Sequence, residues 1–392
     1  MRLVVVGGGV AGPALALAAR QRGLDAVVLE RRAVADTDEG SWITVSPNGL
    51  DALAVLGVLD EVRNIAVPTR TNRMFAATGA RLGELSLGVP LDDGTVALTM
   101  KRSALAALLQ KAAKRAGLEI RLEADVVSTR EEPDRVVAEL AGGEAVCGDV
   151  LVGADGVHSR VRVSLDPTAP AARYVGLTNF GGLTPAAAAG DVAAHLEPEA
   201  WHFVFGRRCF FGAHPLPNGD VVWFVNVPRP EIDRTERART TDDQWLQTLA
   251  TLVDADRGPG SQLVTAGRLE LAGDNTYDLP RVPTWRGCRT VLIGDAVHAP
   301  SPSSGQGAAM ALEDAIVLAT AMKTSGLAGI RAYESTRRTR VEKIVAAGAR
   351  SSSAKVPGPA GRRVQDTMLR IVFRYVVTEK STAWITGYRL PR

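Results

Sequence analysis

Three glycines near the start of the chain have the spacing G-x-G-x-x-G, which lets a backbone approach a diphosphate closely. They are Gly7, Gly9 and Gly12, and they directly follow the apolar residues 3–6. An acidic residue, Glu30, ends a second apolar run at about the spacing expected of an acid that binds a ribose hydroxyl. Because its charge repels a 2′-phosphate, the pattern favours the adenosine of NAD or FAD over that of NADP.

The elements that must position these residues form a β-α-β unit. We expect a strand, a helix and a second strand at residues 3–6, 14–22 and 26–29. In this unit Gly7 permits a tight turn, Gly9 admits a pyrophosphate, and Gly12 lets the helix pack closely on the strand. The helix N-terminus then faces the phosphates with unpaired N–H groups and the positive end of its dipole.

Two other interpretations of the first residues stand beside this one. The segment "ALALAA" at residues 14–19 resembles the cleavage site of a secretory signal, and the glycines could also punctuate a core strand that binds no ligand. Cleavage there would discard the first strand, and the glycines interrupt the apolar run that a signal peptide needs. The dinucleotide site is therefore the favoured interpretation.

Two aspartates far downstream also come where an apolar run ends. They lie in the pairs Asp155-Gly156 and Gly294-Asp295, and the second pair is followed by a proline-rich turn, by "GQG" at residues 305–307 and by an apolar-periodic helix. The ends of parallel strands form the ligand edge of an open sheet. One carboxylate there is often only a helix cap, whereas two favour an extended polyol ligand.

Together these segments resemble the single-component, FAD-dependent group A monooxygenases of the p-hydroxybenzoate hydroxylase fold. The motifs that carry the resemblance are the glycine turn with "ER" at 30–31, "SWITVSPNGLDALAVLGVLDEV" at 41–62, "MKRSALAALL" at 100–109, "GADGVHSRVR" at 153–162, and "GDAVHAPSPSSGQG" at 294–307 with "EDA" at 313–315. The resemblance covers residues 1–346. The segment "GQGAAMALEDA" is most similar to the urate-hydroxylase and zeaxanthin-epoxidase-like branch.

The resemblance implies an α/β fold with a Rossmann-like FAD-binding domain, an interleaved antiparallel β-sheet substrate domain and a C-terminal helical segment. The implied boundaries are 1–70, 95–165 and 285–345 for the FAD-binding domain, 71–94 and 170–280 for the substrate domain, and 346–392 for the C-terminal helices. Period-two stretches between residues 200 and 228 agree with an antiparallel sheet. "PGPAG" at 357–361 divides a basic C-terminal region into two expected helices, for which a solvated face is favoured over a membrane-surface role.

The resemblance also implies non-covalent FAD, with its pyrophosphate at the glycine turn and its ribityl chain at Asp295. The implied cofactor-binding residues are Gly7, Gly9, Val10, Ala11, Gly12, Glu30, Arg31, Thr44, Arg102, Val126, Asp155, Gly156, Gly294, Asp295, Pro302, Ser304, Gly305, Gln306, Gly307 and Ala308. A helix that begins near Gly305 would stabilise the negative charge of reduced flavin with its N–H groups and dipole. Ala308 and Ala309 stand where the family often has Asn or Cys, so only backbone contacts are expected there.

Aromatic residues gather in the middle of the chain. The implied pocket over the flavin is lined by Trp201, Phe203, Phe205, Phe211 and Trp223. The first three share one face of a predicted strand, because alternate residues of a strand point the same way. Urate is not the expected substrate, because residues 220–225 lack the tyrosine that urate-type hydroxylases use there.

Two side chains are candidates for a direct role in the chemistry, Arg208 and His298. Arg208 stands where some related hydroxylases anchor the substrate, although a surface arginine is the favoured interpretation. For His298, a bond to a buried backbone group is favoured over catalysis, because a buried polar group needs a partner.

The function that the resemblance implies is NAD(P)H- and O₂-dependent hydroxylation or epoxidation of an aromatic or electron-rich alkene small molecule through a C4a-hydroperoxyflavin, in secondary metabolism or aromatic degradation. The expected partner is an aromatic or isoprenoid substrate. A second G-x-G-x-x-G motif is not visible in the sequence, so NAD(P)H is expected as a transient co-substrate. Two alternatives remain open. One is a flavin-dependent reductase or dehydrogenase of the same fold, and the other is a non-catalytic, flavin-loaded binding protein.

Composition narrows the partners. The chain is 46% hydrophobic and 23% charged with a net charge of +3, which is globular and gives no reason to expect nucleic acid. Five scattered histidines show no metal spacing, and three cysteines without a C-x-x-C pair favour a reducing compartment, so we expect no metal and a cytoplasmic location. No apolar run reaches ~18 residues, so a membrane span is not expected. A monomer or homodimer is expected.

Overall fold

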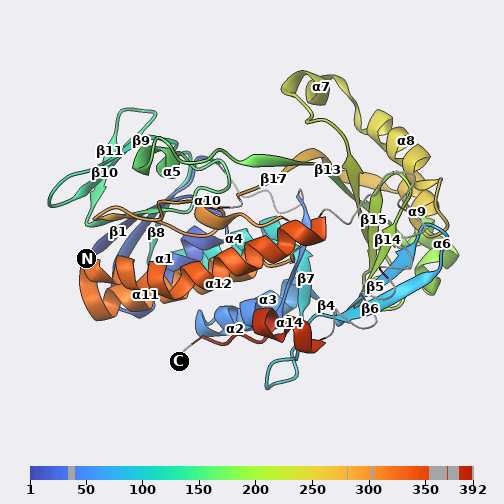
Figure 1. Cartoon of the computed structure of the whole chain (residues 1–392), viewed down its shortest axis with the longest axis horizontal. Helices are drawn as coiled ribbons and strands as arrows, with labels where there is room; N and C mark the ends of the chain where they lie inside the picture. Colours follow the sequence, from blue (N-terminus) through green and yellow to red (C-terminus); the bar gives the residue numbers. More distant parts are fainter. Residues whose placement is uncertain (34–39, 280, 302–303, 353–368, 370–378, 391–392) are drawn as a thin grey trace.

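The chain folds into two lobes connected by long strands (Figure 1). The structure is a computed structural model, and it describes residues 1–392 except 34–39, 280, 302–303, 353–368, 370–378 and 391–392. The first lobe contains the N-terminus and the long helices α11 (Gly307–Ser325) and α12 (Gly329–Ser352). The second lobe is built on one large sheet.

The β-branched runs form a five-stranded parallel sheet in the first lobe, as the sequence predicts. Its strand order is β18 (Thr290–Leu292), β12 (Val150–Gly153), β1 (Arg2–Val6), β2 (Asp25–Leu29) and β8 (Glu119–Arg121). Helices α1 (Ala11–Gln21), α4 (Arg102–Arg115) and α11 share one hydrophobic core with these strands. Because all five strands run in parallel, the segments that follow β1, β12 and β18 come to the same sheet edge.

Two small antiparallel sheets accompany this core. One has the order β11 (Ala145–Gly148), β10 (Val136–Leu140) and β9 (Val126–Glu131), and the other has the order β3 (Trp42–Val45), β7 (Leu98–Lys101) and β4 (Val67–Pro68). The second of these sheets lies where the two lobes meet (Figure 1). The shorter helices of this part are α2 (Pro47–Val55), α3 (Leu59–Ile65), α5 (Arg160–Leu165) and α10 (Asp295–His298).

The second lobe contains a seven-stranded sheet. Its order is β17 (Arg268–Asp278), β13 (Arg173–Thr184), β16 (Val221–Pro228), β15 (Phe210–Pro215), β14 (Ala200–Phe205), β5 (Thr71–Ala76) and β6 (Arg81–Ser86). Residues 71–94, which the implied boundaries give to the substrate domain, contribute β5 and β6 to this sheet, since β5 pairs with both β14 and β6. The pair of β5 with β14 is parallel, and the other neighbouring pairs are antiparallel as expected.

Helices cover one face of this sheet. They are α6 (Ala186–His195), α8 (Asp242–Val253) and α9 (Gly260–Ala266). The short helix α7 (Arg234–Arg239) precedes α8 and has no buried residue. Leu249 and Val253 of α8 and Leu263 of α9 pack with Val204 and Phe211 of the sheet in a second hydrophobic core. The opposite face of the sheet is therefore the one that is turned toward the first lobe.

The C-terminal part of the chain returns to the first lobe. Helix α12 packs along α11, and α14 (Glu379–Thr386) lies near α2. The "PGPAG" segment that is expected to separate two helices lies outside the described residues. None of the helices within the described residues is both long and apolar enough to cross a membrane.

Candidate functional site

The glycine turn after β1 is shaped by packing at two glycines and left open at the third. Gly7 has a φ of +113°, and a Cβ there would lie 2.3 Å from the carbonyl oxygen of Ala154. A Cβ on Gly12 would lie 2.0 Å from the carbonyl oxygen of Gly7. A Cβ on Gly9, by contrast, would have no described heavy atom within 4 Å. The backbone at Gly9 therefore faces open space, which is where a ligand could approach it.

Glu30 braces this turn from the next strand. Its Oε2 accepts a 2.6 Å hydrogen bond from the N–H of Gly8, and its Oε1 accepts one of 2.9 Å from the N–H of Arg32. Gln110 of α4 fixes the same turn, because its Nε2 donates to the carbonyl of Gly8 at 2.6 Å. Each carboxylate oxygen has a second lone pair, so Glu30 can still accept from a ribose hydroxyl.

The N-termini of two helices meet at this edge of the sheet. Gly294, just after β18, is so close to both helices that a Cβ on it would lie 3.2 Å from the Cβ of Ala11 and 3.3 Å from that of Ala311. Among the described residues, no side chain caps the first N–H groups of α1 or of α11. Uncapped N–H groups carry partial positive charge, so this place favours an anionic or electron-rich ligand.

Asp295 is the first residue of α10 and lies beside the start of α11. Its Oδ1 would be 3.7 Å from a Cβ on Gly307. Asp295 is an exposed residue, but the protein atoms around its carboxylate partly desolvate it and so raise its pKa. The charges of His298 and Arg102 oppose this shift. The structure thus brings together Asp295, the exposed Arg102 and the "GQG" turn, which are far apart in the sequence.

Asp155 has a second use in the structure. Its carboxylate accepts hydrogen bonds from Ser159 Oγ at 2.5 Å and from the backbone N–H of Arg160 at 2.7 Å, at the start of α5. The alternative that one of the two aspartates is a helix cap therefore holds for Asp155. Gly156, at a φ of +82°, has open space around its Cβ position, so its backbone remains accessible.

The other expected cofactor residues are spread around the same edge. Val126 is buried, and its carbonyl accepts from Arg160 Nη1 at 2.9 Å. Arg31 is exposed, and Ser304 Oγ accepts from the N–H of Gln306 at 3.1 Å. Pro302 lies outside the described residues. The half-buried residues Val10 and Ala308 pack against the core of the first lobe.

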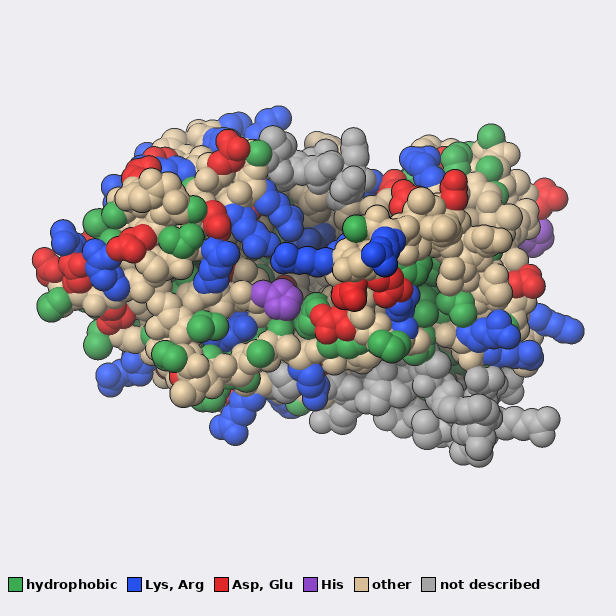
Figure 2. Space-filling view, turned by 90° about the horizontal axis from the view of Figure 1, so that it is seen from above, with side chains coloured by type: hydrophobic (Ala, Val, Ile, Leu, Met, Phe, Trp, Pro, Cys, Tyr) green, Lys and Arg blue, Asp and Glu red, His purple; other side chains and the backbone are tan. Residues whose placement is uncertain are grey.

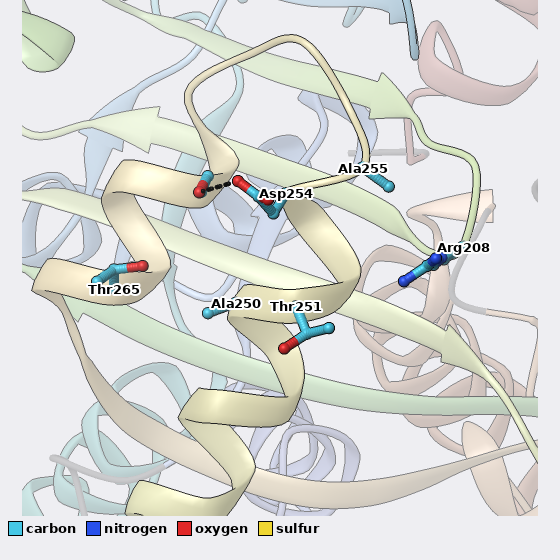
Figure 3. A pocket seen from close by; sticks show the side chains of 7 residues that line it. Arg208, Ala250, Thr251, Asp254, Ala255 and Thr265 are labelled. Atoms are coloured by element: carbon cyan, nitrogen blue, oxygen red, sulfur yellow. Dashed lines mark hydrogen bonds between the residues drawn. The ribbon is translucent and has the colours of Figure 1, made fainter.

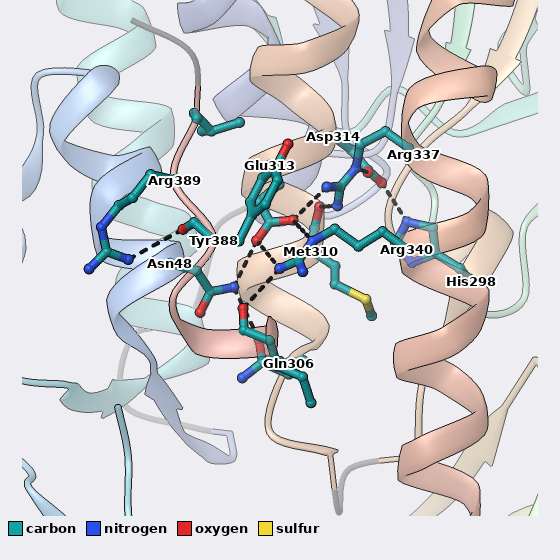
Figure 4. Close-up of polar contacts among 12 residues, drawn as sticks. Asn48, His298, Gln306, Met310, Glu313, Asp314, Arg337, Arg340, Tyr388 and Arg389 are labelled. Atoms are coloured by element: carbon teal, nitrogen blue, oxygen red, sulfur yellow. Dashed lines mark hydrogen bonds and ion pairs between the residues drawn. The ribbon is translucent and has the colours of Figure 1, made fainter. Parts of the chain in front are cut away.

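A buried charge network supports this edge from behind (Figure 4). Arg337 of α12 pairs with two acids of α11, with Glu313 at 2.5 Å and with Asp314 at 2.7 Å, and none of the three side chains is exposed. Asp314 Oδ2 also accepts from the N–H of Gly294 at 3.0 Å and from His298 Nε2 at 2.5 Å. Burial raises the pKa of Asp314, but the charges of His298 and Arg337 outweigh it and bring this pKa down to about 2.

The same network extends to the "GQG" turn. Asn48 of α2 donates from its Nδ2 to Glu313 Oε1 at 2.7 Å and to Gln306 Oε1 at 3.1 Å. Gln306 in turn donates to Ser46 Oγ at 3.0 Å, and Arg340 of α12 pairs with Glu313 at 3.1 Å. Sequence reasoning missed Asn48, Arg337 and Arg340, although the "EDA" segment was a visible signal for their acidic partners.

His298 belongs to this scaffold. Its side chain is 3% exposed and bonds Asp314, so its position favours a structural role over the catalytic one that was considered. No group of three or more metal-ligating side chains occurs among the residues that the structure describes.

The face of the large sheet that is turned toward the first lobe is aromatic. Trp201 stacks on Phe203 with 5.8 Å between ring centroids, and Phe224 lies 5.5 Å from Trp201. Phe210 continues the cluster at 5.1 Å from Phe205. The shared face of Trp201, Phe203 and Phe205 is confirmed.

Two of the expected pocket residues, Phe211 and Trp223, are on the wrong face. Both are almost fully buried in the second core beneath α8 and α9, and Trp223 Nε1 donates to Thr184 Oγ1 at 3.0 Å. Alternation along β15 and β16 instead turns their neighbours Phe210 and Phe224 toward the first lobe. Their burial in this core excludes Phe211 and Trp223 from the aromatic face.

Arg208 is also on the far side of the sheet. It is exposed in the turn between β14 and β15 and lines a shallow pocket with Thr251 of α8 and Thr265 of α9 (Figure 3). Because those helices cover the sheet face opposite to the aromatic one, the structure corrects the suggestion that Arg208 anchors a substrate over the flavin. The surface interpretation holds.

Seen from above, the surface is hollowed between the two lobes, and Lys and Arg side chains gather at this hollow (Figure 2). The aromatic face is bridged to the first lobe by a hydrogen bond of 3.0 Å from Trp201 Nε1 to Thr44 Oγ1 of β3. Trp42, from the same strand, packs with the aromatic cluster. Beside Trp42, Glu270 pairs with Lys101 at 3.1 Å and also with the exposed Arg268 at 3.8 Å.

A glycine turn at an open helix N-terminus, facing a second sheet with an aromatic face, defines a two-lobed dinucleotide-binding protein. The family model described as "FAD binding domain" matches residues 1–348. The chain therefore belongs to this family of FAD-dependent, class A flavoprotein monooxygenases, and its cofactor is FAD.

Named relatives agree with this assignment. Zeaxanthin epoxidase of Solanum lycopersicum is 30% identical over 368 residues, which cover 87% of this chain and 52% of that protein. The chain thus spans about half the length of such relatives. Aurachin C monooxygenase/isomerase of Stigmatella aurantiaca is 28% identical over 355 residues, covering 88% and 87%. Among solved structures, a single-residue variant of Klebsiella pneumoniae HpxO complexed with FAD has a TM-score of 0.81 at 23% identity, covering 98% and 99%, and shows the same fold.

Proposed function

We propose that this protein is an NAD(P)H- and O₂-dependent monooxygenase that hydroxylates or epoxidises an uncharged aromatic or electron-rich alkene small molecule. The observation that carries the proposal is the aromatic face of Phe203, Phe210 and Phe224, which faces the lobe with the glycine turn and is bridged to it by the Trp201–Thr44 hydrogen bond. The relatives named an epoxidase and a monooxygenase support the same class of reaction.

The first lobe would hold FAD through residues whose geometry fits it. The open backbone at Gly9 and the uncapped start of α1 suit the pyrophosphate, Glu30 suits the adenosine ribose, and Asp295 suits the ribityl chain. Bound FAD supplies the chemistry of hydride acceptance and oxygen activation. The backbone N–H groups from Gly305 onward, at the start of α11, would stabilise negative charge on its pyrimidine edge.

The second lobe would select the substrate and exclude water. Half-buried aromatic rings bind a planar or polyunsaturated molecule through dispersion and ring contacts. Because Lys101, the mostly buried cation beside Trp42, is already paired with Glu270, it gives a carboxylate substrate little to pair with. This favours an uncharged substrate over a carboxylate. The co-substrate NAD(P)H would bind transiently in the hollow between the lobes, where basic side chains gather (Figure 2). The thiols of Cys147, Cys209 and Cys288 are unpaired, in keeping with a proposed cytoplasmic location.

Labelled oxygen tests this proposal. The purified protein is screened with uncharged aromatic and isoprenoid compounds for those that accelerate NADH or NADPH oxidation, and the products are then made under ¹⁸O₂. Incorporation of one labelled oxygen atom is expected. Accelerated oxidation without label in any product would instead indicate the reductase or dehydrogenase alternative. Tight binding without acceleration would indicate a binding protein.

A further inference from the structure

A continuous chain of hydrogen bonds crosses between the two lobes beneath the aromatic face. Its members are polar groups from separate segments of the chain, and most of them are fully buried. In order they are the Trp201 indole, the hydroxyls of Thr44, Thr99 and Thr69, the His214 imidazole and the carbonyl of Pro215.

The distances are those of good hydrogen bonds. The oxygen atoms of Thr44 and Thr99 are 2.8 Å apart, and those of Thr99 and Thr69 are 2.7 Å apart. Thr69 Oγ1 lies 3.0 Å from His214 Nε2, and His214 Nδ1 lies 2.8 Å from the carbonyl of Pro215. Thr69 and Thr99 are 0% exposed and His214 is 1% exposed, so water does not compete for these bonds.

The two ends of the hydrogen-bond chain fix the direction in which its protons are donated. The indole N–H of Trp201 can only donate, and the carbonyl of Pro215 can only accept. Each hydroxyl therefore accepts from the preceding group and donates to the next one. Thr69 Oγ1 also lies 3.4 Å from the carbonyl oxygen of Val67, but its contact with His214 is shorter at 3.0 Å. His214 must carry its proton on Nδ1, which leaves the Nε2 lone pair to accept from Thr69. Burial lowers the pKa of His214 to about 4, so this histidine is neutral near pH 7.

Both ends of the hydrogen-bond chain belong to the large sheet, and its three threonines belong to the first lobe. Trp201 lies in β14 and His214 in β15, whereas Thr44 and Thr99 lie in β3 and β7 and Thr69 follows β4. The rings of Trp201 and His214 also meet edge to face at 5.3 Å, which closes the loop. A shift of β3 relative to the sheet would break at least one of these bonds.

Trp201 is only 4% exposed, so it lies under the aromatic face more than on it. Its ring supports Phe203 and Phe224, which are the half-buried rings turned toward the first lobe. A displacement of Trp201 therefore moves the rings that would contact a substrate. Thr44, at the other end of the same hydrogen bond, belongs to the strand expected to line FAD.

We propose that this hydrogen-bond chain holds Trp201 at a fixed place relative to strand β3, and that Trp201 in turn positions Phe203 and Phe224. Thr99 and His214 are then positioning residues. The consequence for turnover rests on the monooxygenase function proposed above. Loss of one link leaves a buried donor or acceptor without a partner, so the aromatic face shifts to recover it. The flavin is then reduced as before, but oxygen reaches the substrate less often and more hydrogen peroxide is released.

The test compares two variants of the FAD-loaded protein that differ in whether a single hydroxyl is kept. Thr99→Val keeps the shape and removes the hydroxyl, and Thr99→Ser keeps the hydroxyl. The Trp201 indole N–H is followed by ¹H–¹⁵N NMR, with Trp201→Phe for assignment. In Thr99→Val we expect a shifted indole signal that exchanges with D₂O about tenfold faster or more, since exchange follows local opening. Thr99→Ser should resemble the wild type.

Turnover is measured in parallel with indole as the probe, or with a stronger stimulator from the screen if indole does not stimulate. Thr99→Val should release a severalfold larger share of peroxide per NADH oxidised, with unchanged FAD content, and Thr99→Ser should not. If Thr99→Val does not fold, Thr69→Val against Thr69→Ser breaks the next link in the same way.

An indole signal and a peroxide share that are both unchanged in a folded valine variant would overturn the proposal. The NMR measurement needs no turnover, so it judges the hydrogen-bond chain even where ¹⁸O₂ labelling of the wild type fails. Such a labelling failure would count against the proposed monooxygenase function.

Discussion

Asp314 and Arg337 form an ion pair of 2.7 Å in which neither side chain is exposed. The pair joins helix α11, which begins at the last glycine of the "GQG" segment, to helix α12. Asp314 also accepts from the N–H of Gly294 at 3.0 Å, next to Asp295. The residues expected to hold the flavin are therefore fixed from behind by buried charges. A complete buried pair of this kind contributes little to the free energy of folding. The loss of one partner destabilises the fold strongly, because the other charge is then buried without an opposite charge beside it.

The first prediction concerns that loss. Arg337→Met leaves Glu313 and Asp314 buried without their common partner and should lower the free energy of unfolding by about 3–5 kcal/mol, as measured by urea unfolding. Arg130→Met is the matched control, because half-exposed Arg130 pairs with Glu132 at the surface, 3.0 Å away, and its loss should change stability very little. Equal effects of the two substitutions would show that the buried network does not hold α11 in place.

The second prediction concerns acid. The pKa of Asp314 is about 2 in the folded protein against 3.8 for an ordinary aspartate, because the charges of His298 and Arg337 outweigh the cost of burial. Since the unfolded chain binds this proton more readily, the contribution of Asp314 is complete above about pH 4 and is lost as the pH falls toward 2. That contribution is about 2 kcal/mol. Asp314→Asn should be less stable at pH 7 and should lose less stability than the wild type between pH 4.5 and 2.5. Parallel curves for the two proteins would contradict this.

The glycine turn, the parallel strands and the alternating aromatic strand could be predicted because each depends on a local pattern. Gly7 and Gly12 follow from spacing in a β-α-β unit, and the common face of Trp201, Phe203 and Phe205 follows from the two-residue period of a strand. The correct face for Phe211 and Trp223 could not be predicted in this way. Their orientation depends on the register of β15 and β16 relative to β14 and on which sheet face α8 and α9 cover. The sequence pattern of a single strand contains neither piece of information.

The residues that hold the site in place could not be predicted from the sequence either. Arg337 follows Glu313 by 24 residues and belongs to another helix, so their ion pair depends on how α11 packs on α12. The hydrogen-bond chain from Trp201 to His214 draws on residues far apart in the sequence, and Thr69, Thr99 and His214 stand in no recognisable motif. Threonines and a histidine at such positions read as ordinary core or surface residues until the fold brings them together. Motifs identify the residues that touch a ligand, whereas packing selects those that hold them.

The third prediction concerns Gly305. This residue has a φ of +60° with open space around its Cβ position, so a side chain there is limited by backbone conformation. Asn adopts this conformation readily and Val does not. Gly305→Val should displace the N–H groups at the start of α11 and lower the flavin reduction potential by tens of millivolts, whereas Gly305→Asn should change it less. The check is a redox titration beside a melting curve. A lowered melting temperature with an unchanged potential in Gly305→Val would leave this turn as scaffolding only.

The last prediction separates packing from ligand binding within the glycine turn itself. A Cβ on Gly12 would lie 2.0 Å from the carbonyl oxygen of Gly7, whereas a Cβ on Gly9 would meet no described atom within 4 Å. Gly12→Ala should therefore destabilise the protein with or without FAD, by about 1–3 kcal/mol for an overpacked site. Gly9→Ala should leave the melting temperature of the FAD-free protein unchanged.

The two variants should differ in the opposite sense when FAD is added. If the backbone at Gly9 approaches the pyrophosphate, a methyl group there occupies the space of the ligand, and the Kd for FAD should rise about tenfold or more, which corresponds to ~1.4 kcal/mol. The measurement is titration of the FAD-free protein by flavin fluorescence, with melting curves before and after loading. The stabilisation that FAD gives the wild type should shrink in Gly9→Ala, because ligand-induced stability follows affinity. Full FAD affinity in Gly9→Ala would mean that the pyrophosphate does not bind against this turn, whatever the role of Gly7 and Gly12 in the fold.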